Sequence, residues 1–271
     1  MSKNSVQRNI ENLHKYDSIT LPIISEEHAK ITIHKFYLHE IENSRVGLFN
    51  VINSIQNISS NDIIELHIAS TGGYMDETYR LINSFQNTGA RIITINNPEA
   101  MSAAAYIFMI GEKRVIFETS TLMFHNYNST VSGRGQVITS YTDHYNKLTF
   151  NLLGELVPQL TDTEINNILA GNDLYFDAYE MCRRGLATHI TINDIEIPAE
   201  LYIDLVNKYS LTEDESQRTP THQTQLKTLK SILKNNPEIL DEYIHDKNKE
   251  VNNLKRSIEL KITELKDKLL F

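Results

Sequence analysis

Ser102 and His125 are the two residues of this chain whose types and spacing best suit covalent catalysis. Ser102 lies in a run of mostly small residues, Ala100–Ala105, which predicts a tightly packed helix. A serine hydroxyl is a weak nucleophile until an imidazole accepts its proton, and His125 follows on a short predicted strand. The pair therefore predicts acyl transfer, which also needs an acid to orient the imidazole and N–H groups to bind an oxyanion.

A glycine pair offers such N–H groups. The segment Ser70-Thr71-Gly72-Gly73 follows a predicted buried strand and precedes a predicted helix, so we expect a tight strand-to-helix turn with N–H groups facing outward. Paired glycines after strands are more often plain turns, so the motif alone is weak evidence. It also lacks the GxGxxG and GxxxxGK[ST] spacing of nucleotide sites, and we expect no cofactor.

An alternation of strands and helices must position these residues. Strands are predicted at 31–38, 63–69, 90–95, 114–117 and 122–126. Helices are predicted at 46–58, at 75–86, from Pro98-Glu99 through Ser102 to Gly111, and at 136–156. A final helix–strand pair is predicted within 178–192. This order predicts an α/β fold whose parallel strands are joined by right-handed crossovers.

The two ends differ from this body. Residues 1–25 have scattered apolar positions and predict an N-terminal arm without the apolar core of a secretory signal. Beyond residue 200 the pattern predicts a helical C-terminal extension, 201–271, after a main domain at 26–200. The apolar stripe of this extension requires a partner surface, and it consists of Val251, Leu254, Ile258, Ile262, Leu265 and Leu269.

The composition disfavours several classes of function. A net charge of -9 argues against binding to nucleic acid, and the longest apolar stretch, Ala100–Ile110, is too short to span a membrane. The single cysteine, Cys182, cannot form an internal disulfide and is expected to be a buried apolar residue. The histidines lack metal-site spacing. We therefore expect a cytoplasmic protein without a metal, a nucleic-acid partner or a membrane span.

The order of the motifs resembles that of the caseinolytic protease proteolytic subunit, ClpP, in the ClpP/crotonase superfamily. That family has an S-P-G-G turn, then a serine in a helix of small residues, a histidine after two short strands, and the pattern D-x-[aromatic]-x-x-A-x-E-x-x-x-x-G-L. Asp173–Leu186 matches the last pattern without a gap. The resemblance covers roughly residues 31–192 and implies a spiral of β-β-α units with a handle helix.

The resemblance also implies roles for individual residues. Ser102 would be the nucleophile, His125 the general base and then acid, and Asp173 the acid that orients the imidazole. The backbone N–H groups of Gly73 and Ala103 would form the oxyanion hole. The implied activity is that of a serine endopeptidase, a hydrolase that acts through an acyl-enzyme.

Substrate and partners follow from the same resemblance. The family holds its polypeptide substrate by strand addition, which here implies contacts near 127–135. The residues expected to contact substrate are Gly72, Tyr127, Asn128, Gly133 and Gly135. The implied assembly is a homo-oligomer, a heptameric or double-heptameric ring. An AAA+ unfoldase partner would supply folded substrates and use the ATP.

The chain departs from the family pattern at several positions. Thr71 replaces the proline of S-P-G-G, and Asn97-Pro98-Glu99 stands where a glycine-containing turn is usual. Thr188 stands where an acidic residue is common. These departures and the extension favour a divergent relative, such as one encoded by a phage. Asp143 on the long helix and Asp177, a predicted cap before Ala178, are competing candidates for the acid.

Three other functions stay open. The chain could be a crotonase-like acyl-CoA hydratase or isomerase, which shares the fold and lacks the serine nucleophile. A second alternative is a non-catalytic ClpP-like structural or assembly subunit. A third is a phage maturation protease of limited cleavage.

Overall fold

The computed structural model describes residues 19–20, 25–28, 31–42 and 45–210, and with gaps residues 231–249. The chain divides into two compact units, residues 1–200 and 201–271. The first unit contains all the candidate residues discussed above. The apolar stripe expected beyond Val251 and most of the expected arm at 1–25 lie outside the described residues.

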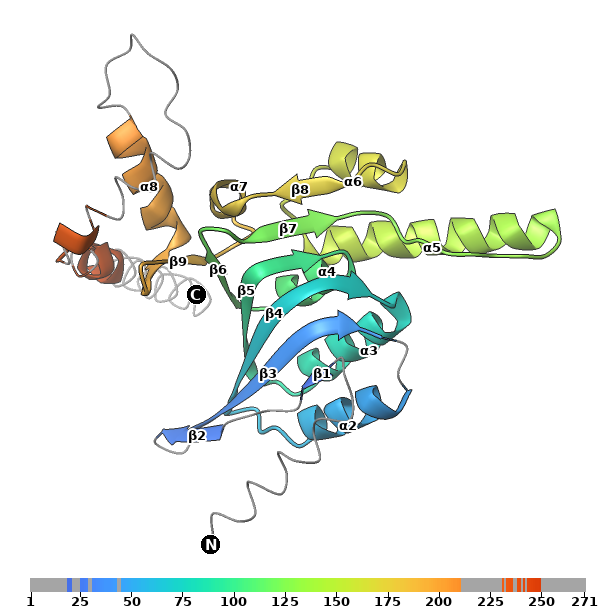
Figure 1. Ribbon diagram of the computed structural model, residues 1–271, viewed down its shortest axis with the longest axis horizontal. Helices are drawn as coiled ribbons and strands as arrows, with labels where there is room; N and C mark the ends of the chain where they lie inside the picture. The colour runs from blue at the N-terminus through green and yellow to red at the C-terminus, as the bar shows by residue number, and fades with distance from the viewer. Residues whose placement is uncertain are drawn as a thin grey trace, which may run out of the picture. The chain divides into compact units, whose positions relative to one another are not determined.

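The described part of the first unit contains a sheet of ten strands (Figure 1). Its parallel centre consists of β3 (Ile31–Ile41), β4 (Ile63–Gly73), β5 (Arg91–Met101) and β6 (Lys113–Phe117). Its outer strands are β1 (Ile19–Thr20), β2 (Ser25–His28), β9 (His189–Ile192) and β10 (Ile195–Pro198). The predicted α/β class is confirmed, as are the parallel central strands.

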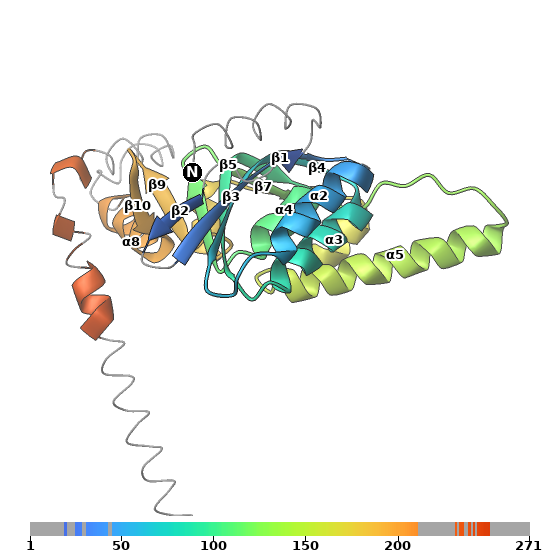
Figure 2. The same cartoon turned by 90° about the horizontal axis from the view of Figure 1, so that it is seen from below.

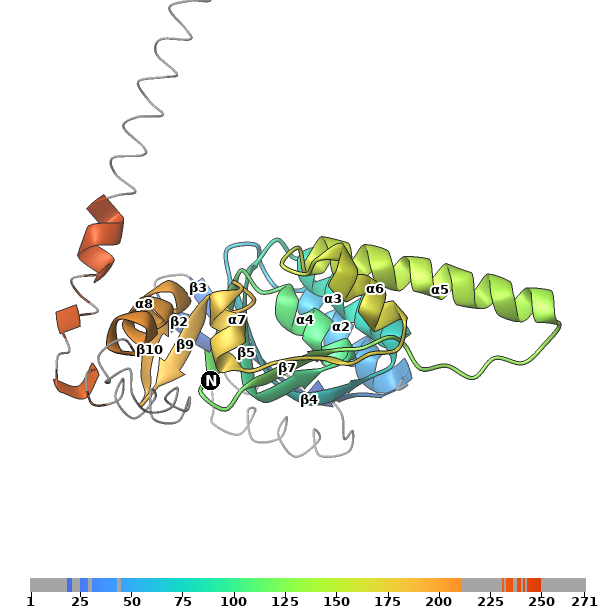
Figure 3. The ribbon, with the colours of Figure 1, turned by 90° about the horizontal axis from the view of Figure 1, so that it is seen from above.

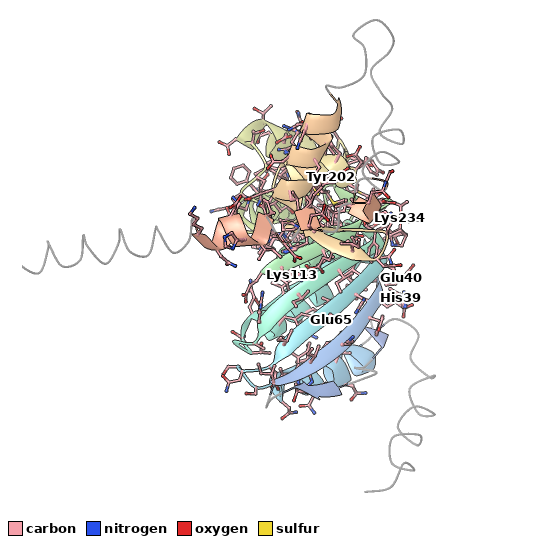
Figure 4. The ribbon with its side chains drawn as sticks, turned by 90° about the vertical axis from the view of Figure 1, so that its left-hand side faces the viewer. His39, Glu40, Glu65, Lys113, Tyr202 and Lys234 are labelled. Carbon is pink, nitrogen blue, oxygen red and sulfur yellow. The ribbon has the colours of Figure 1, made fainter. Side chains whose placement is uncertain are left out.

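One face of this sheet is covered by helices. These helices are α2 (Arg45–Gln56), α3 (Met75–Gln86) and α4 (Ala103–Met109), which lie together in Figure 2. Side chains alternate along a strand, so Ile64, Leu66 and Ile68 of β4 are buried on one face. The opposite face carries half-exposed side chains, among them Glu65 of β4 and Lys113 of β6 (Figure 4). This alternation matches a sheet packed on one side.

Strand β5 has a different neighbour along each half. Residues 93–96 pair with β6, whereas Glu99, Ala100 and Met101 pair in parallel with β7 (Thr121–Phe124). Asn96 stabilises the point where the neighbour of β5 changes, because its Nδ2 donates to the carbonyl of Thr121 over 2.9 Å. Strand β8 (Leu174–Phe176) then pairs antiparallel with β7. The end of β5 therefore lies beside β7, and β8 lies on the other side of β7.

Further helices of the described residues are α5 (Gly135–Leu156), α6 (Asp162–Leu169), α7 (Ala178–Arg183) and α8 (Ala199–Ser210), and helical residues also occur within 231–249. Helix α5 extends well past the sheet. The segment after β7 runs outward to the far end of this helix, where α5 begins and leads back toward the sheet (Figure 3). The long helix expected at 136–156 is therefore confirmed. Within the described residues, no helix is long and apolar enough to cross a membrane.

The helix expected to begin at Pro98-Glu99 is wrong at its start. Both residues lie in β5, and α4 begins only at Ala103. Proline and glutamate are local signals for a helix start, but here pairing with β4 and β7 keeps the backbone extended through Met101. Ser102 is therefore the residue between strand and helix, not a residue within the helix.

The tight turn expected at 70–73 is also wrong. These residues continue β4, because Ser70 pairs with Ala100 of β5 while Gly72 and Gly73 pair with Glu40 and Ile41 of β3. The two glycines have φ values of 109° and 146°, which L side chains rarely adopt. Glycine here lets a paired strand end bend sharply, and the turn itself comes later, at Tyr74.

Candidate active site

Ser102 has a strained backbone at the junction of β5 and α4. Its φ of 55° and ψ of -124° lie in a region that costs a non-glycine residue about 1–3 kcal/mol. Its N–H donates to the carbonyl of Met123 over 2.8 Å, and its carbonyl accepts from the N–H of Ala105 over 3.0 Å. The Ser102 hydroxyl does not cap α4. The fold thus fixes the backbone of this serine and leaves its hydroxyl available.

His125 follows β7 directly and faces this hydroxyl. Its Nε2 lies 2.6 Å from Ser102 Oγ, within hydrogen-bonding distance. The parallel pairing of Met101 with Met123 sets this contact, because it aligns the ends of β5 and β7. The imidazole is partly exposed and can therefore both accept the hydroxyl proton and return it to a substrate group.

Asp173 comes directly before β8, as His125 comes directly after β7. Strands β7 and β8 pair Phe124 with Leu174, the last pair of their ladder, and His125 and Asp173 are the next residues beyond that pair. The Asp173 carboxylate is exposed and makes no hydrogen bond to another described residue. Ser102 and His125 are therefore joined, whereas Asp173 is a neighbour that is not bonded to either.

The other two candidate acids lie elsewhere. Asp177 caps α7, since its Oδ1 accepts from the N–H of Glu180 over 2.8 Å, and the predicted cap is confirmed. Asp143 is exposed on α5. Burial raises the pKa of the Cys182 thiol to about 12, so this buried cysteine carries no thiolate at neutral pH.

The ion pair between Arg184 and Glu164 stabilises the elements on either side of Asp173. Arg184 donates to both carboxylate oxygens of Glu164 in α6 over 2.6 and 2.7 Å and to the carbonyl of Gln159 over 2.8 Å. Its guanidinium also lies 5.0 Å from the centre of the Phe176 ring in β8. The bond from Arg184 is the main reason that the pKa of Glu164 falls to about 2. This contact fixes α6 and β8 on either side of the Asp173 loop.

The ion pair predicts an acid-sensitive part of the stability. Because the pKa of Glu164 is lower in the folded chain than its ordinary 4.5, its contribution is complete above about pH 5 and is lost as pH falls toward 2. We expect Glu164→Gln to lower the free energy of unfolding at pH 7 and to differ little from the unchanged protein near pH 2. Urea unfolding at several pH values measures this difference.

The matched control is Glu180→Gln. Glu180 also pairs with an arginine, Arg183, but both side chains are well exposed, so solvent screens the pair and its removal has a smaller effect. A Glu164→Gln difference that is equal at pH 3 and pH 7 would contradict this role.

Two backbone N–H groups lie near the hydroxyl. In β4, the N–H of Tyr74 donates to the carbonyl of Ile41 over 2.9 Å, so in a parallel ladder the N–H of Gly73 points away from β3. Ala103 opens α4, and the first N–H groups of a helix have no partner within it. A Cβ built on Gly72 would lie 3.0 Å from the Ala103 nitrogen. Gly73 and Ser102 line the same pocket, and Ala103 follows Ser102 directly, so both expected donors belong to this site.

A pocket of about 600 Å³ opens beside Ser102 and His125. It is lined by Gly73–Asp76, Ser102, Tyr106, His125–Thr130, Tyr141, Tyr145 and Thr149. Tyr127 and Asn128, expected to contact substrate, are among these residues. Gly72 packs behind Ser102, and Gly133 and Gly135 lie at the far end of the segment that leads into α5.

Sequence reasoning missed several residues of this site. Asn126 is one, since its Nδ2 donates to the carbonyl of Leu169 over 3.1 Å and so connects the segment after His125 to the last residue of α6. Tyr106 is another, one helical turn after Ser102. Its spacing from Ser102 was the one signal in the sequence that could have indicated a shared pocket.

A serine–imidazole pair at a strand end, next to backbone donors and an open pocket, is the arrangement of enzymes that transfer acyl groups through a serine. The sequence model of the Clp protease family matches residues 23–194, more than half of the chain. The chain therefore belongs to the Clp protease family, a family of peptidases, and the resemblance seen in the motif order is confirmed. Comparison with curated proteins finds no match.

Proposed function

We propose that this protein is a serine endopeptidase that cleaves polypeptides through an acyl-enzyme on Ser102. The observation that carries the proposal is the 2.6 Å hydrogen bond between Ser102 Oγ and His125 Nε2 at the mouth of the pocket. Membership of a peptidase family supports polypeptide as the substrate.

The proposed reaction has two steps. Ser102 Oγ attacks the scissile carbonyl while His125 Nε2 takes its proton, and the resulting oxyanion accepts hydrogen bonds from the N–H groups of Gly73 and Ala103. His125 then donates the proton to the leaving amine, which breaks the peptide bond and leaves an ester on Ser102. A water molecule, deprotonated by His125, hydrolyses the ester and regenerates the hydroxyl.

Asp173 is proposed as the acid that orients His125. The pairing of Phe124 with Leu174 supports this role, because His125 and Asp173 are the next residues beyond that pair. The carboxylate is exposed and free of hydrogen bonds to other described residues, so a change of side-chain rotamer can bring it toward Nδ1 without breaking a contact. Catalytic hydrogen bonds are often long before substrate binds and shorten in the complex.

Substrate would bind along the segment that follows β7. Tyr127 and Asn128 line the pocket, and the Tyr127 hydroxyl donates to the carbonyl of Thr142 in α5 over 3.3 Å. An extended peptide that pairs with this segment is held by its main chain, which tolerates many side-chain sequences. Gly133 and Gly135 would let the same segment turn into α5.

We also propose that the protein assembles as a homo-oligomeric ring of seven subunits or two such rings. Helix α5 supports this, because Val137, Ile138 and Phe150 expose 54, 37 and 38% of their surface, and such large apolar groups favour contact with another chain. An AAA+ unfoldase would act as partner and use the ATP, since the sequence has no phosphate-binding loop. Native mass measurement tests the ring: seven or fourteen 31.2 kDa subunits are expected, and a monomer would contradict it.

Peptide hydrolysis is the test of the function. We expect the purified protein to cleave fluorogenic peptides and unfolded polypeptides. A ring that cleaves no peptide would support a non-catalytic assembly subunit instead. Tight binding of acyl-CoA without peptide cleavage would support a crotonase-like enzyme. Cleavage confined to one site in one protein would support a maturation protease.

Gly72→Ala should lower the rate of peptide hydrolysis strongly while the protein still folds. A methyl group at Gly72 would lie 2.7 Å from Ser102 Cβ and 2.8 Å from the Met101 carbonyl oxygen, and the φ of 109° disfavours a side chain. Ser102 must then move, and a shift of about 1 Å in a reacting group costs about 10²-fold in rate. We expect kcat/KM to fall by about this factor in a peptide assay.

Gly154→Ala is the control for this substitution. Gly154 lies within α5 at an ordinary φ, and no atom lies within 4 Å of an added Cβ. Alanine there should stabilise the helix by about 1 kcal/mol and leave kcat/KM unchanged. Full activity of Gly72→Ala would show that the close contact with Ser102 is not needed.

A further inference from the structure

One residue that lines the pocket has a hydroxyl without a partner among the described residues. Tyr106 follows Ser102 by one turn of α4 and lines the pocket, although only 2% of its surface is exposed. Its ring packs edge-on against Phe124, with ring centres 5.7 Å apart. Its hydroxyl makes no hydrogen bond to another described residue. Because Tyr106 lines the pocket, its free hydroxyl can accept a hydrogen bond from a bound group.

The walls of the pocket are rich in tyrosine. Tyr141 and Tyr145 of α5 lie with ring centres 4.5 Å apart, and Tyr127 lies 5.4 Å from Tyr145. Tyr74, another lining residue, is 56% exposed. Such rings offer apolar surface to a methylene chain and electron-rich faces to a cation.

The charge that lines the pocket is negative. Asp76, in the first turn of α3, is a lining residue, and no lysine or arginine appears among the described lining residues. The carboxylate of Asp76 lies close enough to the tyrosines to act on them. Burial, followed by the charges of Tyr145 and Asp76, raises the pKa of Tyr79 to about 12. Apart from Asp76 and the tyrosines, His125 is the one titratable residue among the described residues that line the pocket.

We propose that this pocket is a specificity subsite that takes a lysine or arginine side chain from the substrate residue whose carbonyl Ser102 attacks. The inference rests on the proposed peptidase function. The methylene stem would pack along Tyr141 and Tyr145, and the cation would lie near Asp76 and the ring faces. A terminal N–H would donate to the Tyr106 hydroxyl. Asp76 thereby favours basic residues and disfavours acidic ones.

Two peptide comparisons test the subsite. The peptides differ only at the residue before the scissile bond, which is lysine, norleucine or glutamate, and norleucine keeps the stem without the charge. We expect kcat/KM for lysine to exceed that for norleucine about tenfold, and glutamate to be the poorest. Equal or better cleavage after norleucine would overturn the subsite.

Substitutions of Asp76 identify the residue responsible. Asp76→Asn should reduce the lysine-to-norleucine ratio to about 2 or less, and Asp76→Lys should raise the glutamate-to-norleucine ratio above that of the unchanged protein. A merely structural role of Asp76 would not invert the charge preference. Asp143→Asn removes an equal charge from α5 outside the pocket lining and should leave the ratio unchanged. An unchanged ratio in Asp76→Asn would overturn the assignment.

Different results would overturn the proposed subsite and the proposed peptidase function. Cleavage of norleucine peptides without a preference for lysine would overturn the subsite and leave the peptidase function intact. An absence of cleavage of all three peptides, with no covalent labelling of Ser102, would overturn both.

Discussion

Alanine at position 102 is expected to lower kcat for peptide hydrolysis by at least about 10⁴-fold and to leave the fold unchanged. The substitution removes the oxygen that lies 2.6 Å from His125 Nε2, and no other described hydroxyl takes its place in that hydrogen bond. The hydroxyl does not cap α4, so the helix loses no cap with it. Fluorogenic peptide assays measure kcat, and thermal unfolding and native mass show whether the protein still folds and assembles.

A control for this prediction is Ser129→Ala. Ser129 also lines the pocket, and its hydroxyl lies 3.2 Å from that of Tyr141, away from the serine–imidazole pair. We expect Ser129→Ala to change kcat/KM only a few-fold. Undiminished kcat in Ser102→Ala would refute the assignment of the nucleophile.

Asn at position 173 is expected to lower kcat by about 10³- to 10⁴-fold. The amide has the size of the carboxylate but no charge, so it cannot stabilise the imidazolium that forms when His125 takes the proton. It can also hold the wrong imidazole tautomer. The prediction depends on the pairing of Phe124 with Leu174, which brings the chain segments of His125 and Asp173 together. The steady-state rate with one peptide at saturation gives kcat.

Asp177→Asn and Asp143→Asn are the matched controls. Asparagine caps helices about as well as aspartate, so Asp177→Asn should keep α7 and nearly full activity. Asp143 is exposed on α5 and outside the pocket lining, and its substitution should also be nearly neutral. Full activity in Asp173→Asn combined with a large loss in either control would transfer the role of the acid to that other residue.

The sequence predicted the parallel centre of the sheet because each strand and helix there has its own hydrophobic period. The helices expected at 75–86 and 136–156 agree closely with α3 and α5. The short elements β8 and β10 were not predicted, since three or four residues give no reliable period. Asp173, next to β8, could be found only through the motif that it opens.

The backbone around the candidate nucleophile was not predictable from local signals. Pro98 and Glu99 favour a helix start, yet β7, some 20 residues later in the chain, pairs with the end of β5 and keeps it extended. Gly72 and Gly73 favour a turn, yet pairing with β3 continues the strand. In both cases a partner distant in sequence determined the conformation, and the site lies where these pairings end.

The residues of the pocket could not be predicted as a group. Asp76, Tyr106 and Tyr145 come from three different helices, and none belongs to a recognised motif. Asn126 bonds to a carbonyl 43 residues away. Only the packing of α3, α4 and α5 around the end of the sheet brings these side chains to one opening, and no spacing in the sequence records it.

Covalent labelling with a fluorophosphonate, followed by peptide mapping, tests the central claim most directly. The reagent reacts with a serine whose proton a neighbouring base can take. We predict one phosphonate per subunit, attached to Ser102, with loss of peptide hydrolysis in proportion to labelling and no labelling in His125→Ala. Hydrolysis that persists in fully labelled protein, or a phosphonate attached to another residue while Ser102 stays free, would contradict the account.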